Sequence, residues 1–86
     1  MHSVEWKVKA WKQLQKIGDR KLKERILATS SNLTAFPACQ NVKTLVNHQY
    51  PYRLRVGDWR LFFSIENTEI TIIYIEEVKK RDDHTY

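Results

Sequence analysis

The chain has 86 residues, of which 42% are hydrophobic and 29% charged, with a formal net charge of +5. This length allows one domain, 1–86, and the composition is that of a globular protein rather than a disordered or membrane-spanning one. A single cysteine, Cys39, excludes an internal disulfide framework and a cysteine-rich zinc site. Residues 1–7 show no secretory signal, so we expect a cytoplasmic location. No group of His, Cys and carboxylate residues has the spacing of a metal site, and we expect neither a metal nor a cofactor.

The first half of the chain is basic and has helical periodicity. Residues 1–43 contain nine Lys and Arg against three Asp and Glu. Apolar residues in 10–17 and in 22–33 recur every three or four positions, which predicts two helices. Gly18 fits the left-handed position after the first helix, and Asp19 fits the N-cap of the second.

The second half of the chain alternates apolar and polar residues, which predicts strands. Residues 52–56, 59–65 and 70–77 form three such runs, and 3–6 is a further candidate strand. A type II′ turn at Gly57-Asp58 and a second turn at 67–68 join the three runs. The predicted fold class is therefore α+β, with an N-terminal helical hairpin packed on a twisted antiparallel β-sheet.

The first of these turns places basic residues together. It pairs Arg55 with Arg60 and puts both, with Arg53 and Phe62, on the face opposite the apolar residues. Like charges directly across a strand pair are destabilising, so stability alone does not account for them. The plain alternative is a solvated sheet face, with ordinary surface ion pairs.

The second turn predicts how the next strand lies. It pairs Phe63 with Ile72, Leu61 with Tyr74, and Arg60 with Ile75. The tail that follows, 79–86, then leaves the sheet near the arginines. Arginine, histidine and aromatic side chains suit a phosphodiester and a stacked base.

Two segments carry a family resemblance. The run YRLRVGDWRLFF at 52–63 resembles the central hairpin of the RelE/ParE superfamily of bacterial toxins, and VKKRDDHTY at 78–86 resembles its closing segment. The resemblance covers nearly the whole chain and implies a RelE-like, microbial-RNase-like architecture. It implies a type II toxin whose partners are a cognate antitoxin, the ribosome and mRNA. RelE-like members are mRNA interferases, endoribonucleases that inhibit translation by cutting mRNA in the ribosomal A site.

The resemblance also implies roles for single residues. Arg53 and Arg55 match the basic residues of the first hairpin strand, and Arg60 matches the arginine after the turn. Arg81 matches the basic residue of the tail, and Tyr86 its terminal aromatic, which would orient the nucleotide. Several RelE-like enzymes have lysine where Arg55 stands, and a guanidinium stays protonated and cannot act as a general base.

His84 is the titratable candidate for proton transfer in the tail, because an ordinary imidazole titrates near neutral pH. The expected reaction is attack of a 2′-OH on the adjacent phosphate, giving a 2′,3′-cyclic phosphate. Arg60 and Arg81 would stabilise the charge of the transition state. The expected catalytic set is Arg55, Arg60, Arg81, His84 and Tyr86.

Further residues are candidates for RNA binding because they carry a positive charge or an exposed ring: Arg53, Phe62, Lys79, Lys80, Lys9, Lys12 and Lys16. Of the other aromatic residues, Trp59 is expected in the core and His48 on the surface. One alternative is a ParE-like inhibitor of DNA gyrase on the same fold. Another is a nucleic-acid-binding module without catalysis.

Overall fold

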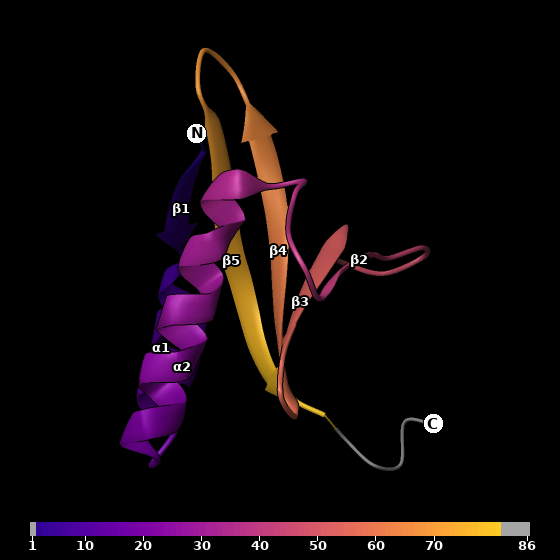
Figure 1. Ribbon diagram of the computed structural model, residues 1–86. Helices are drawn as coiled ribbons and strands as arrows, with labels where there is room; N and C mark the ends of the chain where they lie inside the picture. The colour runs from indigo at the N-terminus through magenta and orange to yellow at the C-terminus, as the bar shows by residue number, and fades with distance from the viewer. Residues whose placement is uncertain (1, 82–86) are drawn as a thin grey trace.

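In the computed structural model, which describes residues 2–81, two helices lie against a five-stranded sheet (Figure 1). The strand order is β1-β5-β4-β3-β2, and β1 runs parallel to β5 while the other neighbours are antiparallel. The α+β class is confirmed, with a mixed rather than purely antiparallel sheet. The elements are β1 Ser3–Trp6, α1 Val8–Gln15, α2 Arg20–Ser31, the 3₁₀ helix Asn32–Ala35, β2 Val42–Thr44, β3 Tyr52–Val56, β4 Trp59–Asn67 and β5 Thr71–Lys80.

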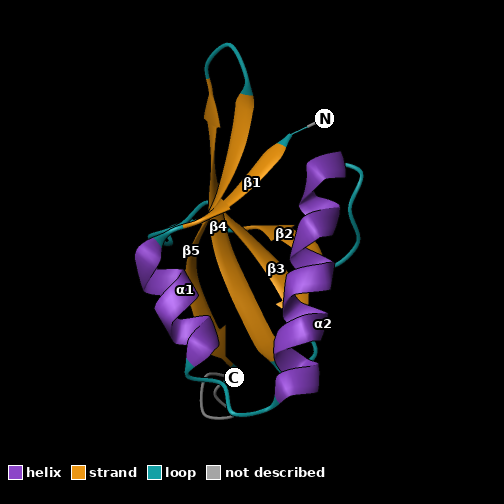
Figure 2. Ribbon diagram, turned by 90° about the vertical axis from the view of Figure 1, so that its left-hand side faces the viewer, coloured by secondary structure: helices purple, strands orange, loops and turns teal. Residues whose placement is uncertain are grey.

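Both helices cover the same face of the sheet (Figure 2). They run antiparallel, as predicted, but each packs mainly on the sheet, α1 against β5 and α2 against β3. The opposite face of β3, β4 and β5 carries no helix of the described chain (Figure 1). Neither helix is long and apolar enough to cross a membrane.

Of the two predictions for the turn between the helices, the one for Asp19 is confirmed and the one for Gly18 is wrong. Asp19 is the N-cap of α2, and its carboxylate accepts a hydrogen bond from the backbone N–H of Leu22 at 3.1 Å. The left-handed conformation predicted for Gly18 is wrong, because the positive φ among the glycines belongs to Gly57. The chain ends α1 with a tighter bond instead, from the N–H of Ile17 to the carbonyl of Leu14 at 3.1 Å.

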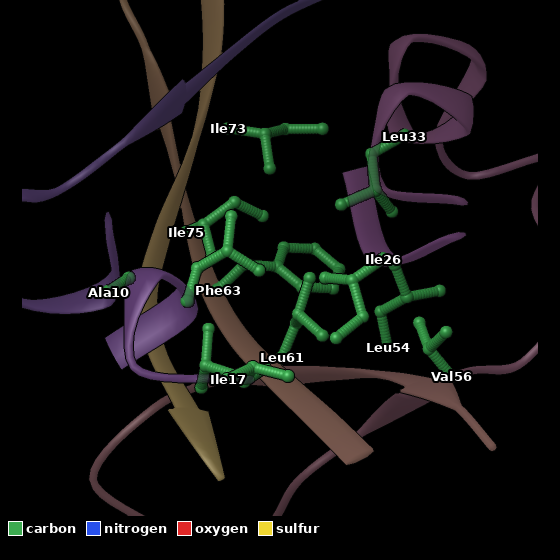
Figure 3. Packing of buried hydrophobic residues seen from close by; sticks show 12 residues of the cluster. Ala10, Ile17, Ile26, Leu33, Leu54, Val56, Leu61, Phe63, Ile73 and Ile75 are labelled. Atoms are coloured by element: carbon green, nitrogen blue, oxygen red, sulfur yellow. The ribbon is translucent and has the colours of Figure 1, made fainter. Parts of the chain in front are cut away.

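The core lies between the helices and the sheet (Figure 3). The predicted helical stripes supply Ala10, Leu14, Ile17, Ile26 and Leu33, all buried. The strands supply the other members of the cluster, namely Leu54, Val56, Leu61, Phe63, Ile73, Ile75 and Val78. Trp59 packs against this cluster and is half-buried, close to its predicted place in the core.

The register predicted for the first hairpin is confirmed. Val56 lies opposite Trp59, Arg55 opposite Arg60, and Arg53 opposite Phe62. Gly57 has φ +59°, the left-handed value that the first position of a type II′ turn requires and that glycine adopts without a Cβ clash. This turn fixes which side chains of β3 and β4 share a face.

The register predicted for the second hairpin is wrong. Three residues, 68–70, separate β4 from β5, so Phe63 pairs with Ile75 instead of Ile72. A β-bulge in β5 adds one more position, because Phe62 pairs with Glu77 and Phe63 with Ile75, which leaves Glu76 between them as the extra residue. Arg60 therefore lies opposite Lys79 rather than Ile75. The run of apolar residues at 70–75 gives no alternation, so it does not specify which side chains face the core.

The edge of β5 beyond β1 is covered by α1. The side-chain oxygen Oε1 of Gln13 accepts a hydrogen bond from the backbone N–H of Val78 at 2.6 Å, in a partly buried position. Lys9 reaches Glu77 of the same strand, with 3.6 Å between Nζ and the carboxylate. These contacts replace a neighbouring strand and hold the end of β5 against the helix.

We predict that Gln13→Ala lowers the free energy of unfolding by about 1–3 kcal/mol, because the N–H of Val78 loses its acceptor. Urea denaturation followed by circular dichroism measures the change. Gln15→Ala is the matched control, since Gln15 is exposed at the end of the same helix. Equal stabilities of the two variants would contradict the role given to Gln13.

Candidate nucleic-acid interface

The side of β3–β5 that no helix of the described chain covers carries the arginines of the first hairpin and Lys79. Because side chains alternate along a strand, burial of Leu54 and Leu61 against the helices places their neighbours on the other side. We call this surface the arginine face and define it by Arg53, Arg55, Arg60, Phe62 and Lys79. The clustering predicted from the first hairpin is therefore confirmed at the level of strand register.

One row of this face consists of cations. Arg55, Arg60 and Lys79 are consecutive partners across β3, β4 and β5. Arg81 is the first residue after β5, and its backbone N–H donates to the carbonyl of Asp58 at 2.6 Å, so the chain stays beside the hairpin turn. Such a row attracts a polyanion.

The next row combines charge with aromatic rings. It consists of Lys43 on β2, Arg53 on β3, Phe62 on β4 and Glu77 on β5. Phe62 is only 7% exposed, because the ring of His48 stacks on it at 4.9 Å and that of Tyr50 at 5.9 Å. A base on this surface would therefore meet His48 or Tyr50 first, and the ring of Phe62, predicted to be exposed, is buried under them.

His48 is exposed, as predicted, but its orientation is fixed. Its Nδ1 accepts a hydrogen bond from the backbone N–H of Tyr50 at 3.0 Å. An amide N–H can only donate, so in this arrangement the ring proton of a neutral His48 is on Nε2. His48 is thus placed to donate a hydrogen bond to an oxygen and to offer its ring for stacking.

Arg55 bends away from the row to which its backbone belongs. Its Nε donates to the carbonyl of Gly57 at 3.2 Å. Arg55 also lines a cavity beside the end of β3, together with Arg25 of α2. Arg53 and Arg60 are half-buried, and Arg81 is exposed.

The predicted lysines divide between the two sides of the sheet. Lys79 lies on the arginine face, whereas Lys80 pairs with Trp59 and by alternation belongs to the helix side. Lys9, Lys12 and Lys16 are exposed on or just after α1, and Lys9 pairs with Glu77 of β5. His84 and Tyr86 lie outside the described residues.

Neither metal nor thiol chemistry is suggested by the described chain. Within residues 2–81, no group of three or more His, Cys, Asp or Glu side chains could hold a metal ion. Burial raises the pKa of the Cys39 thiol above its ordinary value, which disfavours the reactive thiolate.

The pKa of Tyr74 is also raised, chiefly by its hydrogen bond with Glu66. A protonated phenol at Tyr74 is therefore retained to higher pH.

The comparisons with known proteins place the chain in a family. Residues 4–83 match the family model of the ParE toxin of type II toxin–antitoxin systems. The chain therefore belongs to this family of toxins, and the predicted membership of the RelE/ParE superfamily is confirmed. No curated protein sequence matches the chain significantly.

Solved structures share the fold over most of the chain. An archaeal RelE–RelB complex from Pyrococcus horikoshii OT3 is 25% identical, with a TM-score of 0.76 over 95% of this chain and 97% of that one. The toxin–antitoxin complex RelBE2 from Mycobacterium tuberculosis is 22% identical, with a TM-score of 0.76 over 93% and 98% of the two chains. A RelB–RelE complex from Methanococcus jannaschii is 17% identical, with a TM-score of 0.62 over 87% of each.

Some residues of this surface were not predicted from the sequence. The sequence pattern does not distinguish Lys43, Tyr50 or Arg25, and it predicts His48 only as a surface residue. The available signal was the aromatic-rich run 48–52 just before β3. Arg25 gave no signal, because only the packing of α2 on β3 brings it near Gly57.

We predict that Phe62→Ala lowers the free energy of unfolding by about 3–5 kcal/mol, as expected for truncation of a buried phenylalanine. Urea denaturation is again the measurement. Val46→Ala serves as control, because Val46 is 82% exposed and its truncation should change stability by less than about 0.5 kcal/mol. A stable Phe62→Ala variant with reduced RNA binding would instead restore Phe62 as a stacking platform.

Proposed function

We propose that this toxin is an mRNA interferase, an endoribonuclease that cuts mRNA in the ribosomal A site and so inhibits translation. The observation that carries the proposal is the row formed by Arg55, Arg60 and Lys79, with Arg81 beside the same turn. Guanidinium groups bind phosphate oxygens with two parallel hydrogen bonds and keep their charge at every working pH. A cationic surface of this kind suits the cleavage of a phosphodiester.

The proposed reaction begins with attack of a 2′-OH on the adjacent phosphorus. The new bond from O2′ to phosphorus forms as the bond from phosphorus to O5′ breaks, which leaves a 2′,3′-cyclic phosphate and a 5′-OH. Arg60 and Arg81 would stabilise the added negative charge of the transition state. The proton of the 2′-OH requires an acceptor, and the arginines cannot serve. His84 is the proposed acceptor, as the titratable residue of the tail. The proton that completes the 5′-OH comes from water or from the protonated acceptor. Tyr86 would orient the nucleotide, by resemblance.

The aromatic rings beside the arginine row support the binding of single-stranded nucleic acid at this surface. His48 and Tyr50 stack over Phe62, next to Arg53. Stacking of a base on an aromatic ring together with charge on the backbone is how proteins hold unpaired nucleotides. We therefore propose that His48 or Tyr50 receives a base whose phosphate lies at Arg60.

The proposed protein partner is a cognate antitoxin. The structurally similar chains were solved as complexes of toxin with antitoxin. An antitoxin that inhibits this toxin would place acidic side chains at the arginine face. Because such an antitoxin would bind only the folded state, it would also stabilise the small toxin domain against unfolding.

A second candidate is inhibition of DNA gyrase, and the match to the ParE toxin model favours it. Such a toxin would trap a gyrase–DNA complex and would cut no RNA itself. A gyrase supercoiling assay with the same purified protein distinguishes the two activities.

We predict that Arg81→Ala and Arg60→Ala each reduce the rate of mRNA cleavage by about 10²–10³-fold, the usual effect of removing one group that stabilises transition-state charge. The measurement maps new mRNA ends after incubation of antitoxin-free toxin with translating ribosomes. Circular dichroism checks that each variant is folded, which matters most for the half-buried Arg60.

The matched control is Arg20→Ala, which removes the same charge from an exposed position on α2. It should cleave at the wild-type rate. If the folded wild-type toxin produces no new mRNA ends but inhibits supercoiling, the interferase proposal is wrong and the gyrase candidate replaces it. If it does neither while binding RNA, the non-catalytic module is the better description.

A further inference from the structure

A cavity beside the end of β3, next to the hairpin turn, is lined by two arginines that are distant in the sequence. It has a volume of about 300 Å³ and is lined by Arg25, Thr29, Asn41, Arg55, Val56 and Gly57. Arg25 and Thr29 lie one turn apart on α2, Asn41 precedes β2, and Arg55 is on β3. The cavity therefore lies beside the arginine face, around the edge of the sheet.

The hairpin turn positions both guanidinium groups. Nη1 of Arg25 lies 3.4 Å from the point where a Cβ on Gly57 would stand, so this side chain rests against the backbone of the turn. The Nε of Arg55 donates to the carbonyl of the same Gly57 at 3.2 Å. The backbone N–H of Arg55 in turn donates to the carbonyl of Asn41 at 3.0 Å, which fixes the opposite wall.

The charge in this cavity is not neutralised by the part of the chain that the structure describes. Over residues 2–81, neither Arg25 nor Arg55 has a carboxylate oxygen within 4.0 Å, and no acidic residue lines the cavity. The remaining polar side chains of the lining, Thr29 and Asn41, can both donate hydrogen bonds. Two neighbouring cations repel each other, and an anion between them removes that cost.

We propose that this cavity is a phosphate-binding subsite that holds a phosphodiester of single-stranded RNA next to the one at Arg60. Two guanidiniums with hydroxyl and amide donors match the several acceptor oxygens of a phosphate better than the two of a carboxylate. Arg55 stands directly opposite Arg60 in the sheet, so a strand bound along the arginine row reaches the cavity at its next step. The RNA part rests on the proposed function, whereas phosphate binding does not.

The first test is a titration of ¹⁵N-labelled toxin with inorganic phosphate at constant ionic strength. We expect saturable NMR shifts at the amides of Asn41 and Gly57, and at the Nε signals of Arg25 and Arg55. Arg25→Gln should weaken this binding at least 10-fold, as for loss of a charge-assisted hydrogen-bonding group. Arg20→Gln is the control, with the same substitution at an exposed site of the same helix.

Three outcomes would overturn the assignment of a phosphate site: shifts that do not saturate, equal weakening in the two variants, or acetate binding as tightly as phosphate. The last would assign the cavity to a carboxylate, such as an acidic side chain of a protein partner. None of them depends on catalysis, so failure of the ribonuclease proposal is separate from failure here.

The second test measures binding of a hexanucleotide with 2′-O-methyl groups, which cannot be cleaved by 2′-OH attack, over a range of salt. Loss of one phosphate contact should reduce the slope of log K against log[salt] by about 0.7 in Arg25→Gln, with affinity reduced about 5–10-fold. Arg20→Gln should keep the wild-type slope. An unchanged slope in Arg25→Gln would remove the cavity from the path of RNA even if it binds phosphate.

Discussion

The structure depends on the burial of alternate residues of β3 and β4 against the two helices. Leu54, Leu61 and Phe63 are almost fully buried, and each side chain of this size contributes roughly 1.5–3 kcal/mol by leaving water. The cross-strand repulsion between Arg55 and Arg60 is at most about 1 kcal/mol, so burial of the apolar set decides the orientation of the hairpin. The arginines are concentrated on the other face as a consequence.

The bulge in β5 decides which residue lies beside these arginines. Its extra residue is Glu76, opposite Phe62 and Phe63, and together with the three-residue turn it brings Lys79 opposite Arg60. Because β1 pairs with only part of β5, the end of that strand needs another neighbour, and α1 supplies it through Gln13. The helical half of the chain therefore supports the charged surface without being part of its central row.

The arginine face is divided by how each side chain continues from its strand. The backbone of Arg60 lies in the central row, whereas the side chain of Arg55 bends toward Gly57, and Arg55 lines a cavity together with Arg25. The glycine matters because its φ of +59° makes the turn, and the guanidinium of Arg25 lies beside it. The same turn thus sets the strand register and positions a second group of cations.

The sequence by itself determined the elements whose signals are local. Alternation in 52–65 and the Gly57-Asp58 turn specify the first hairpin, and Asp19 specifies the start of α2, because these depend on neighbours along the chain. Only the tertiary structure decided the pairing of β5, the cover of His48 and Tyr50 over Phe62, and the meeting of Arg25 with Arg55. The apolar run at 70–75 is compatible with either face, so its register follows from packing against the core. Likewise, contacts between α2 and the hairpin turn arise when separate elements dock, and no periodicity in the chain encodes them.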